Sequence, residues 1–468
     1  MNTNRDSISA LIRHAACIGG EQIPDDVMQW TALLFKDTVS CILAGGTADG
    51  IPAIRDSFLL WGGHPQATVL GFGDKTSAPS VAFINAVMGH ARDFDDTHDA
   101  AVHHGCVTIV PALLAVTELM GTTGRSNVSG REFIAALAIG LDVANRIGMA
   151  FIPYLDTGWL PTTLWGPFGC VAACGRLMGF DESTMANAFG LAYSAIHGNR
   201  QALIEGKLAK RIQPGFSAQA GVQAAYFAAS GLTAATEIVD GNYGIPALYT
   251  SGQCDREWLT DNLGITFETS RVSIKPYPSC RCTHAVIDAA MTLMREHAFT
   301  WQDISKGIIH LPPQAMGQVG HPFQIRDNPT VDAQFNAPYT AALTFIHGKL
   351  VLDDFRPEAI RSRDDIVKLA TQFVCVEFEK EASGLVPVDM AIILKDGRRM
   401  EVRITTPKGG PDNPLTNEEM TMKFTDCLNH AVKKYSVDER DAIEALLNNI
   451  LDAESIDIGT LTTHAKKD

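Results

Sequence analysis

The stretch Ala391–Thr405, AIILKDGRRMEVRIT, carries the clearest β-hairpin signal in the chain. Two runs rich in β-branched and other apolar residues flank Asp396-Gly397, a dipeptide typical of a two-residue hairpin turn. Two more strands are predicted upstream, at 307–311 before a Pro-Pro pair and at 373–378 with alternating β-branched residues. These strands predict a small α+β domain, which we place at residues 269–402.

The rest of the chain is predicted to be helical, because apolar residues recur at helical spacing between residues that start or stop helices. Pro111 is expected to open one of these helices. The expected helices begin near residue 25 and end before Gly45-Gly46, and then span about 80–92, 112–120, 130–149, 181–197, 417–434 and 438–451. The fold class is therefore mainly α, with a large, discontinuous helical domain at 1–268 and 403–468.

Composition excludes several classes of protein. The 468 residues, 46% hydrophobic and 19% charged, indicate a globular chain of two domains. A formal charge of −15 argues against binding to nucleic acid or to an anionic membrane surface. The ten cysteines are scattered without a Cys-x-x-Cys motif, and no apolar N-terminal signal or membrane-length run is evident. We therefore expect reduced thiols and a cytoplasmic protein.

Residues 93–104 concentrate groups that can exchange protons. Metal binding fits the residue types, but the spacing matches no compact metal motif. A solvated loop explains one capping aspartate but not three imidazoles. Acid/base chemistry is the preferred interpretation, since histidine titrates near neutrality and a carboxylate can orient it. The sequence leaves open which histidine acts. The groups are Asp93, Asp95, Asp96, Asp99, His98, His103 and His104.

A second candidate segment, 203–219, holds Lys207, Lys210 and Arg211 within five residues. Such a cluster is usually a solvated helix face. The flanking residues Ile204 and Leu208 are apolar, however, so part of the segment is expected to be buried. A buried cation needs an anion, and a bound carboxylate would supply one.

The third candidate segment is Lys275–His284, KPYPSCRCTH. Its two prolines hold the backbone extended, which suits a lysine fixed against a substrate. The alternative is a linker turn with exposed Lys275 and Arg281. Cys280 lacks the neighbours of a known nucleophilic motif, so a buried or pocket-lining thiol is the preferred interpretation.

With these motifs in view, the chain resembles the MmgE/PrpD family over nearly its whole length. The resemblance rests on four segments in the right order, at 89–98, 205–216, 275–284 and 333–339. The family includes 2-methylcitrate dehydratase, cis-aconitate decarboxylase and iminodisuccinate epimerase. The resemblance implies a large helical domain, a smaller α+β lid, a homodimer, an active site between the domains, and no metal or organic cofactor.

The resemblance also implies roles for individual residues. The positions matching the catalytic set of the decarboxylases are Asp93, Thr97, His103, Lys210 and Lys275. We expect His103 to be the general acid/base, with Asp93 and Thr97 orienting it or the substrate. Substrate contacts are expected from Lys207, Arg211, Cys280, Arg281 and His284. Two positions depart from the decarboxylases, since Cys280 replaces a histidine and Phe335 replaces a tyrosine.

These groups fit a reaction that forms or protonates a carbanion next to a carboxylate. Our first hypothesis is a cofactor-independent dehydratase, a lyase acting on a small di- or tricarboxylate. The second is an epimerase or isomerase of a related polycarboxylate, and a cis-aconitate-type decarboxylase is a further alternative. A non-catalytic or metal-binding relative is the hypothesis from a different class. The expected partners are an anionic carboxylate and a second copy of the chain.

Overall fold

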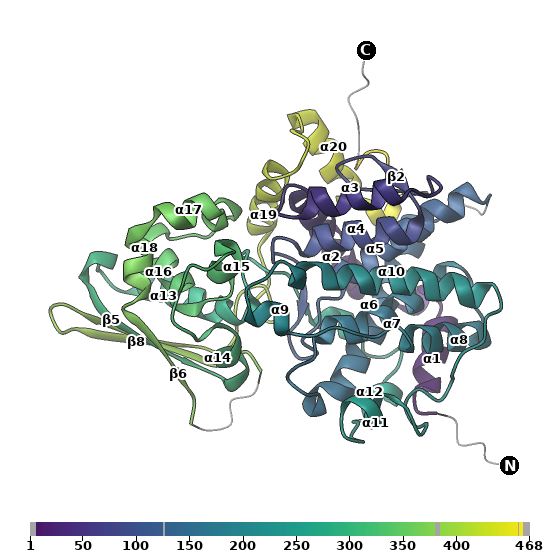
Figure 1. Cartoon of the computed structure of the whole chain (residues 1–468), viewed down its shortest axis with the longest axis horizontal. Coiled ribbons are helices and arrows are strands. Elements are labelled where there is room, and N and C mark those ends of the chain that lie inside the picture. Colours follow the sequence, from purple (N-terminus) through teal and green to yellow (C-terminus); the bar gives the residue numbers. More distant parts are fainter. Residues whose placement is uncertain (1–5, 125–126, 380–383, 457, 462–468) are drawn as a thin grey trace.

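The computed structural model describes residues 6–124, 127–379, 384–456 and 458–461. Its buried apolar side chains form two large cores. One core draws on residues from Ile8 to Ile274 and from Phe424 to Leu461, and we call this part the helical body. The other lies mainly within Tyr277–Met400, and we call residues 277–404 the lid. Figure 1 shows the two parts side by side, and the mainly α fold with a smaller α+β part is confirmed.

The helical body is built around long, apolar helices that pack on one another. Small residues allow close approach, for example where Gly140 of α6 meets the backbone of Gly169 in α7. The body contains α1 (Ser9–Cys17), α2 (Asp25–Gly45), α3 (Ile51–Trp61), α4 (Ala78–His90), α5 (Cys106–Thr122), α6 (Gly130–Phe151), α7 (Pro161–Leu177), α8 (Glu182–Tyr193), α9 (Gln201–Ile204), α10 (Ala209–Ala229), α11 (Ile245–Tyr249), α12 (Glu257–Thr260), α19 (Asn417–Asn429) and α20 (Val437–Asn448), and the short strands β1 (Ala67–Thr68), β2 (Lys75–Thr76), β3 (Thr97–His98) and β4 (Val272–Ser273).

Helix α5 begins five residues before Pro111, so the prediction that Pro111 opens this helix is wrong. The backbone N–H groups of Gly105 and Cys106 donate to the Asp96 carboxylate, 3.0 and 3.1 Å away. This carboxylate, nine and ten residues upstream of those two amides, satisfies donors that a helix start leaves unpaired. Pro111 is then accommodated inside the first turns.

Helix α6 is the one described helix long and apolar enough to cross a membrane, counted together with the turn to Tyr154. We expected no such segment from the sequence. Nearly all of it is buried inside the body, as in the core helix of many folded proteins. Its polar residues Asp142 and Arg146 are also buried, and they form an ion pair with 3.0 Å between Oδ1 and Nε.

The lid is a four-stranded sheet packed against helices. The strand order is β6 (Phe373–Glu377), β5 (Ile304–Leu311), β7 (Val388–Leu394) and β8 (Arg399–Ile404). The predicted hairpin is confirmed, with Ile393 opposite Arg399 and Gly397 in the left-handed conformation of its turn. The lid helices are α13 (His284–Glu296), α14 (Pro313–Val319), α15 (Pro329–Gln334), α16 (Ala337–His347), α17 (Pro357–Ser362) and α18 (Asp364–Ala370).

We call residues 93–104 the acidic loop. Two connections hold this part of the chain against the segment that leads into the lid and against the lid itself. Strand β3 pairs antiparallel with β4, with Thr97 opposite Ser273. The Gln334 side chain of the lid donates to the backbone carbonyl of Arg92, 2.7 Å away. Residues 93–98 therefore lie where the body meets the lid.

Candidate active site

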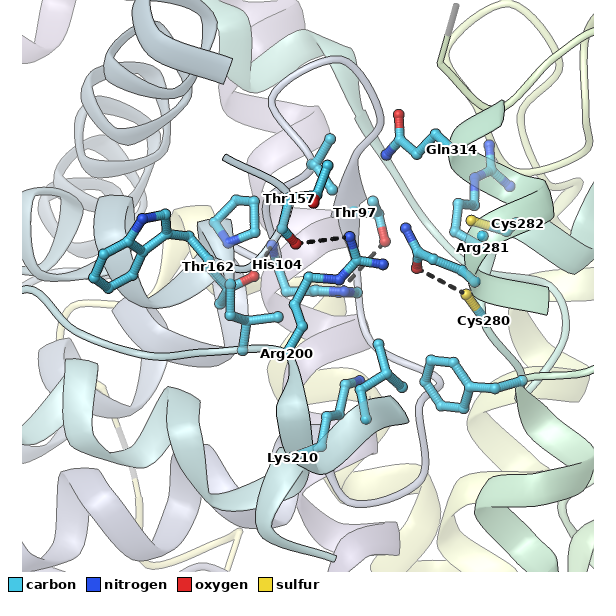
Figure 2. A pocket seen from close by; sticks show the side chains of 18 of the residues that line it. Thr97, His104, Thr157, Thr162, Arg200, Lys210, Cys280, Arg281, Cys282 and Gln314 are labelled. Atoms are coloured by element: carbon cyan, nitrogen blue, oxygen red, sulfur yellow. Dashed lines mark hydrogen bonds between the residues drawn. The ribbon is translucent and has the colours of Figure 1, made fainter. Parts of the chain in front are cut away.

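A cavity of about 840 Å³ opens between the helical body and the lid. Its wall combines the acidic loop, the start of α10, the segment entering the lid and helix α14. Figure 2 shows side chains from these elements pointing toward one another. Its charged and polar lining includes Asp93, Thr97, Asp99, His104, Arg200, Lys210, Lys275, Cys280, Arg281 and Gln318.

The carboxylate of Asp93 lies between two ammonium groups from distant parts of the chain. Lys210 Nζ is 2.7 Å from Asp93 Oδ1, and Lys275 Nζ is 3.3 Å from Oδ2. Lys275 also donates to the Asp93 backbone carbonyl, 2.9 Å away. Asp93 adopts a φ of 52°, a left-handed conformation that aspartate tolerates better than most residues. The three predicted residues therefore form one buried cluster.

Burial and charge oppose each other in this cluster. Burial alone would raise the pKa of Asp93, but the ammonium groups of Lys210 and Lys275 outweigh it and lower that pKa below its usual range. Burial would lower the pKa of Lys275, but the carboxylates of Asp93 and Asp95 outweigh it and raise that pKa. The cluster is thus a carboxylate held between two charged lysines.

His104 also lines the cavity, from the loop that precedes α5. Its Nδ1 atom lies 2.7 Å from the Asp96 carbonyl oxygen and 3.1 Å from Asp95 Oδ2, both of which can only accept. Nδ1 therefore carries the ring proton in the neutral imidazole. Nε2 is left as a lone-pair base without a hydrogen-bond partner among the described residues.

Asp95 lies behind His104 and holds a second imidazole, that of His90, with 2.8 Å between Oδ2 and Nδ1. Burial lowers the pKa of His90 to about 4, despite the attraction of Asp95. These three groups have the types and proximity of a metal site. The ammonium groups of Lys210 and Lys275 act on the same groups, and they disfavour a divalent cation there.

His103, the predicted acid/base, does not reach the surface of the cavity. It is fully buried, with Nδ1 2.9 Å from Asn145 Oδ1, and it is absent from the lining. Burial lowers its pKa to about 3. His98 is also buried and contacts Glu268 Oε2 through Nε2, at 3.2 Å. The geometry therefore favours His104 as the histidine that meets a substrate.

Arg281 lines the cavity, but its donors are already used. Nε and Nη2 contact the Asp99 carboxylate at 3.1 and 2.9 Å, and Nη1 donates to the Lys408 carbonyl at 2.7 Å. In Figure 2 its guanidinium points away from the middle of the cavity. His284 is buried outside the lining and contacts Arg281 Nη1 at 3.2 Å. The contact between Arg281 and Asp99 therefore joins the lid to the body. Neither Arg281 nor His284 presents a free group to the cavity.

Cys280 lines the cavity from the lid side, next to Cys282. Its thiol lies 3.9 Å from Gln318 Oε1. A hydrogen bond from Cys282 and the charge of Lys275 lower the pKa of Cys280, against the effect of burial. This matches the expected pocket-lining thiol and gives it acid/base capacity.

The remaining predicted residues lie in different environments. Lys207 is outside the lining, half exposed, and paired with Asp327 at 2.6 Å. Arg211 is buried but also outside the lining, and burial followed by the charge of Arg92 lowers its pKa to about 10. Thr97 lines the cavity with Oγ1 3.4 Å from His104 Nδ1. Phe335 lies under Lys210, with 5.0 Å from Nζ to the ring centre.

Sequence reasoning missed Arg200 and Gln318, which also line the cavity. Arg200 lies in a loop, ten residues before Lys210, and so falls outside the cationic cluster at 207–211 that the sequence analysis singled out. No local pattern marks either residue. Only the approach of the 194–200 loop and of α14 to the acidic loop brings them into the site.

Comparison with known proteins identifies the family of the chain. The model of the MmgE/PrpD N-terminal domain matches residues 9–257, and that of the C-terminal domain matches residues 277–449. The chain belongs to the MmgE/PrpD family, as its motifs predicted.

Similar curated proteins cover almost the whole chain at low identity. The cis-aconitate decarboxylase-like protein oryM of Aspergillus oryzae is 26% identical, covering 94% of this chain and 93% of its own. Cis-aconitate decarboxylase of Aspergillus terreus is 23% identical, covering 96% and 94%. Cis-aconitate decarboxylase of Homo sapiens is 25% identical, covering 95% and 91%. These similarities support an enzyme of this family.

Proposed function

We propose that the protein is a cofactor-independent hydro-lyase that removes water from a small hydroxylated polycarboxylate. The observation that carries the proposal is the presence, in one cavity, of the unused Nε2 of His104 and of the ammonium groups of Lys210 and Lys275. Removing a proton next to a carboxylate places negative charge on its oxygens. Fixed cations stabilise that charge and so lower the barrier.

The proposed reaction uses two proton-transfer groups. Nε2 of His104 takes the proton from the carbon next to the carboxylate, and the C–H electrons form an enediolate held by Lys210 and Lys275. The enediolate then forms the C=C bond and expels the neighbouring hydroxyl, which takes the thiol proton of Cys280 and leaves as water. Lys275 stabilises the thiolate, and proton transfer from His104 to Cys280 restores the starting state.

Two other reactions fit the same groups. Decarboxylation is supported by the names of the relatives. The replacement of a histidine by Cys280 and of a tyrosine by Phe335, relative to the decarboxylases that the chain resembles, weighs against it. Epimerisation is the runner-up, because His104 and Cys280 reach the cavity from the body and from the lid and could exchange a proton on opposite faces of one carbon.

Proton NMR in D₂O separates the three reactions. The purified protein is incubated with methylcitrate, citrate, cis-aconitate, malate, tartrate and iminodisuccinate in turn. We expect a new alkene signal from one of the hydroxy acids. With cis-aconitate, which already holds a double bond, we expect the alkene signal to be lost by hydration. Deuterium incorporation at the α carbon without net conversion would favour the epimerase, and release of carbon dioxide would favour the decarboxylase.

The setting of the reaction is also part of the proposal. We propose that a homodimer in the cytoplasm carries it out without metal, and without binding nucleic acid or membranes. Activity that survives treatment with a strong chelator, and a mass near twice 50.5 kDa by light scattering, are the expected results. Loss of activity that zinc or iron restores would overturn the metal-free mechanism.

A further inference from the structure

Arg200 is the cavity-lining cation whose charge the described protein leaves unpaired. It precedes α9 in the helical body, and Figure 2 shows its guanidinium projecting into the cavity between His104 and Cys280. Its side chain donates a hydrogen bond from Nη1 to the Thr157 carbonyl oxygen, 3.1 Å away. No carboxylate lies within ion-pair distance of it in residues 6–124, 127–379, 384–456 and 458–461.

The other cations of the cavity differ from Arg200 in this respect. Lys210 and Lys275 share the carboxylate of Asp93, and Asp95 lies close behind Lys275. Arg281 uses its guanidinium on Asp99 and on a backbone carbonyl. Arg200 is therefore the lining cation that no carboxylate of the described residues pairs with directly, although the Asp156 carboxylate also lines the cavity. Its Nε and Nη2 groups remain available for a planar, two-oxygen acceptor.

The cavity thus has two separate positions for carboxylates. The lysine pair forms the first, because Lys210 contacts Asp93 through one of its three donors and can bind another anion. Arg200 forms the second. A third carboxylate would meet no further lining cation with free donors among the described residues, since Arg281 is already bonded. A single carboxylate would leave Arg200 without an anion.

We infer that Arg200 binds the distal carboxylate of the substrate and that the substrate class is the dicarboxylates. This inference rests on the proposed function for the position of the reacting carboxylate at the lysine pair. It goes beyond that function by choosing between substrates with two and with three carboxylates. It also makes Arg200 the residue that determines this specificity.

The test measures binding and does not depend on turnover. Isothermal titration calorimetry compares succinate, butyrate and tricarballylate, which carry two, one and three carboxylates on similar carbon chains. Wild-type protein should bind succinate more tightly than the other two. In Arg200→Gln, affinity for succinate should fall about 10- to 100-fold, to the level of butyrate, because a charge-assisted bidentate contact is lost. Affinity for butyrate should stay within about twofold.

Controls separate this role from a structural one. Arg200→Lys keeps the charge without the fork and should recover part of the succinate affinity. Arg13→Gln removes an exposed guanidinium on α1, paired with Glu182, and should leave all three affinities unchanged.

Equal weakening of succinate and butyrate binding in Arg200→Gln would overturn the inference, as would tighter binding of tricarballylate than of succinate by the wild type. Dicarboxylate binding without any dehydration would overturn the proposed function and leave the inference standing. Absence of succinate binding would overturn the inference, and the proposed function would fall with it only if no hydroxy acid were dehydrated either.

Discussion

Nδ1 of His104 lies 2.7 Å from the backbone carbonyl oxygen of Asp96. This contact sets the tautomer, because a carbonyl oxygen can only accept and the ring proton must be on Nδ1. The other nitrogen of the ring is thereby made the base. One backbone contact thus determines which atom of the loop can take a proton from a bound molecule.

His104→Gln should therefore reduce turnover by about 10²- to 10⁴-fold, the usual contribution of a general acid/base. The melting temperature should change little, since the ring lines the cavity. His103→Gln is the matched variant, because it alters the adjacent buried imidazole. It should lower stability while keeping most of the turnover rate of the remaining folded protein. Steady-state kinetics with thermal melts checks both, and the reverse pattern would restore His103 as the acid/base.

Cys280→Ser should separate the two proton transfers. The weaker acidity of the hydroxyl should slow water loss, while His104 still removes the α proton. We expect deuterium exchange at the α carbon to continue in D₂O as alkene formation falls, measured by NMR on one sample. Cys282→Ser keeps the neighbouring position as a hydrogen-bonding group and should affect both rates less. If exchange and elimination fall together in Cys280→Ser, the thiol does not act as the separate acid.

Asp93→Asn should destabilise the protein by about 3–5 kcal/mol, because it leaves two buried ammonium groups without their carboxylate. Urea unfolding measures this change. Added succinate should recover part of the loss, since its carboxylate can replace the missing anion. Asp37→Asn breaks another buried pair, with Lys423 at 2.6 Å, and should destabilise similarly, but succinate should stabilise this variant no more than it stabilises the wild type. Equal stabilisation of the two variants by succinate would argue that its carboxylate does not replace that of Asp93.

Stability should decrease as the pH falls from about 6.5 toward 4. Burial lowers the pKa of His90 to about 4 and of His103 to about 3, so the unfolded chain binds protons in this range that the folded chain does not. The stabilisation is complete above the unfolded pKa and is lost as the pH approaches the folded values. Urea unfolding at several pH values should show this slope. His103→Gln should flatten it, whereas exposed His64→Gln should leave it unchanged.

Asp96 should act with the opposite sign. Burial and then the charge of Asp95 raise the pKa of Asp96 to about 6, so its contribution is present below the unfolded pKa near 4 and is lost as the pH rises through 6. Asp96→Asn keeps an acceptor for the first amides of α5 without the buried charge. Its stability relative to wild type should therefore be higher at pH 8 than at pH 5. A pH-independent difference in urea unfolding would contradict this assignment.

Local patterns in the sequence predicted much of the fold. Apolar residues at helical spacing correspond to α2, α4, α6 and α19, and Asp396-Gly397 correctly predicted the β7–β8 turn. These features are decided by neighbours in the chain, through periodicity and turn chemistry. The start of α5 was missed because its capping carboxylate, Asp96, comes from a loop outside the helix. A pattern of nearby residues does not report such a cap.

The sequence by itself determined which chemical groups the protein has and, through its motifs, the family to which it belongs. Only the tertiary structure decided their arrangement. Asp93 meets Lys210 and Lys275 across 117 and 182 residues of chain. His103 and His104 are neighbours in sequence, yet one is buried against Asn145 and the other faces the cavity. Arg200 enters the site without any motif. Contacts this distant depend on how elements far apart in the chain pack together, and local spacing carries no record of that packing.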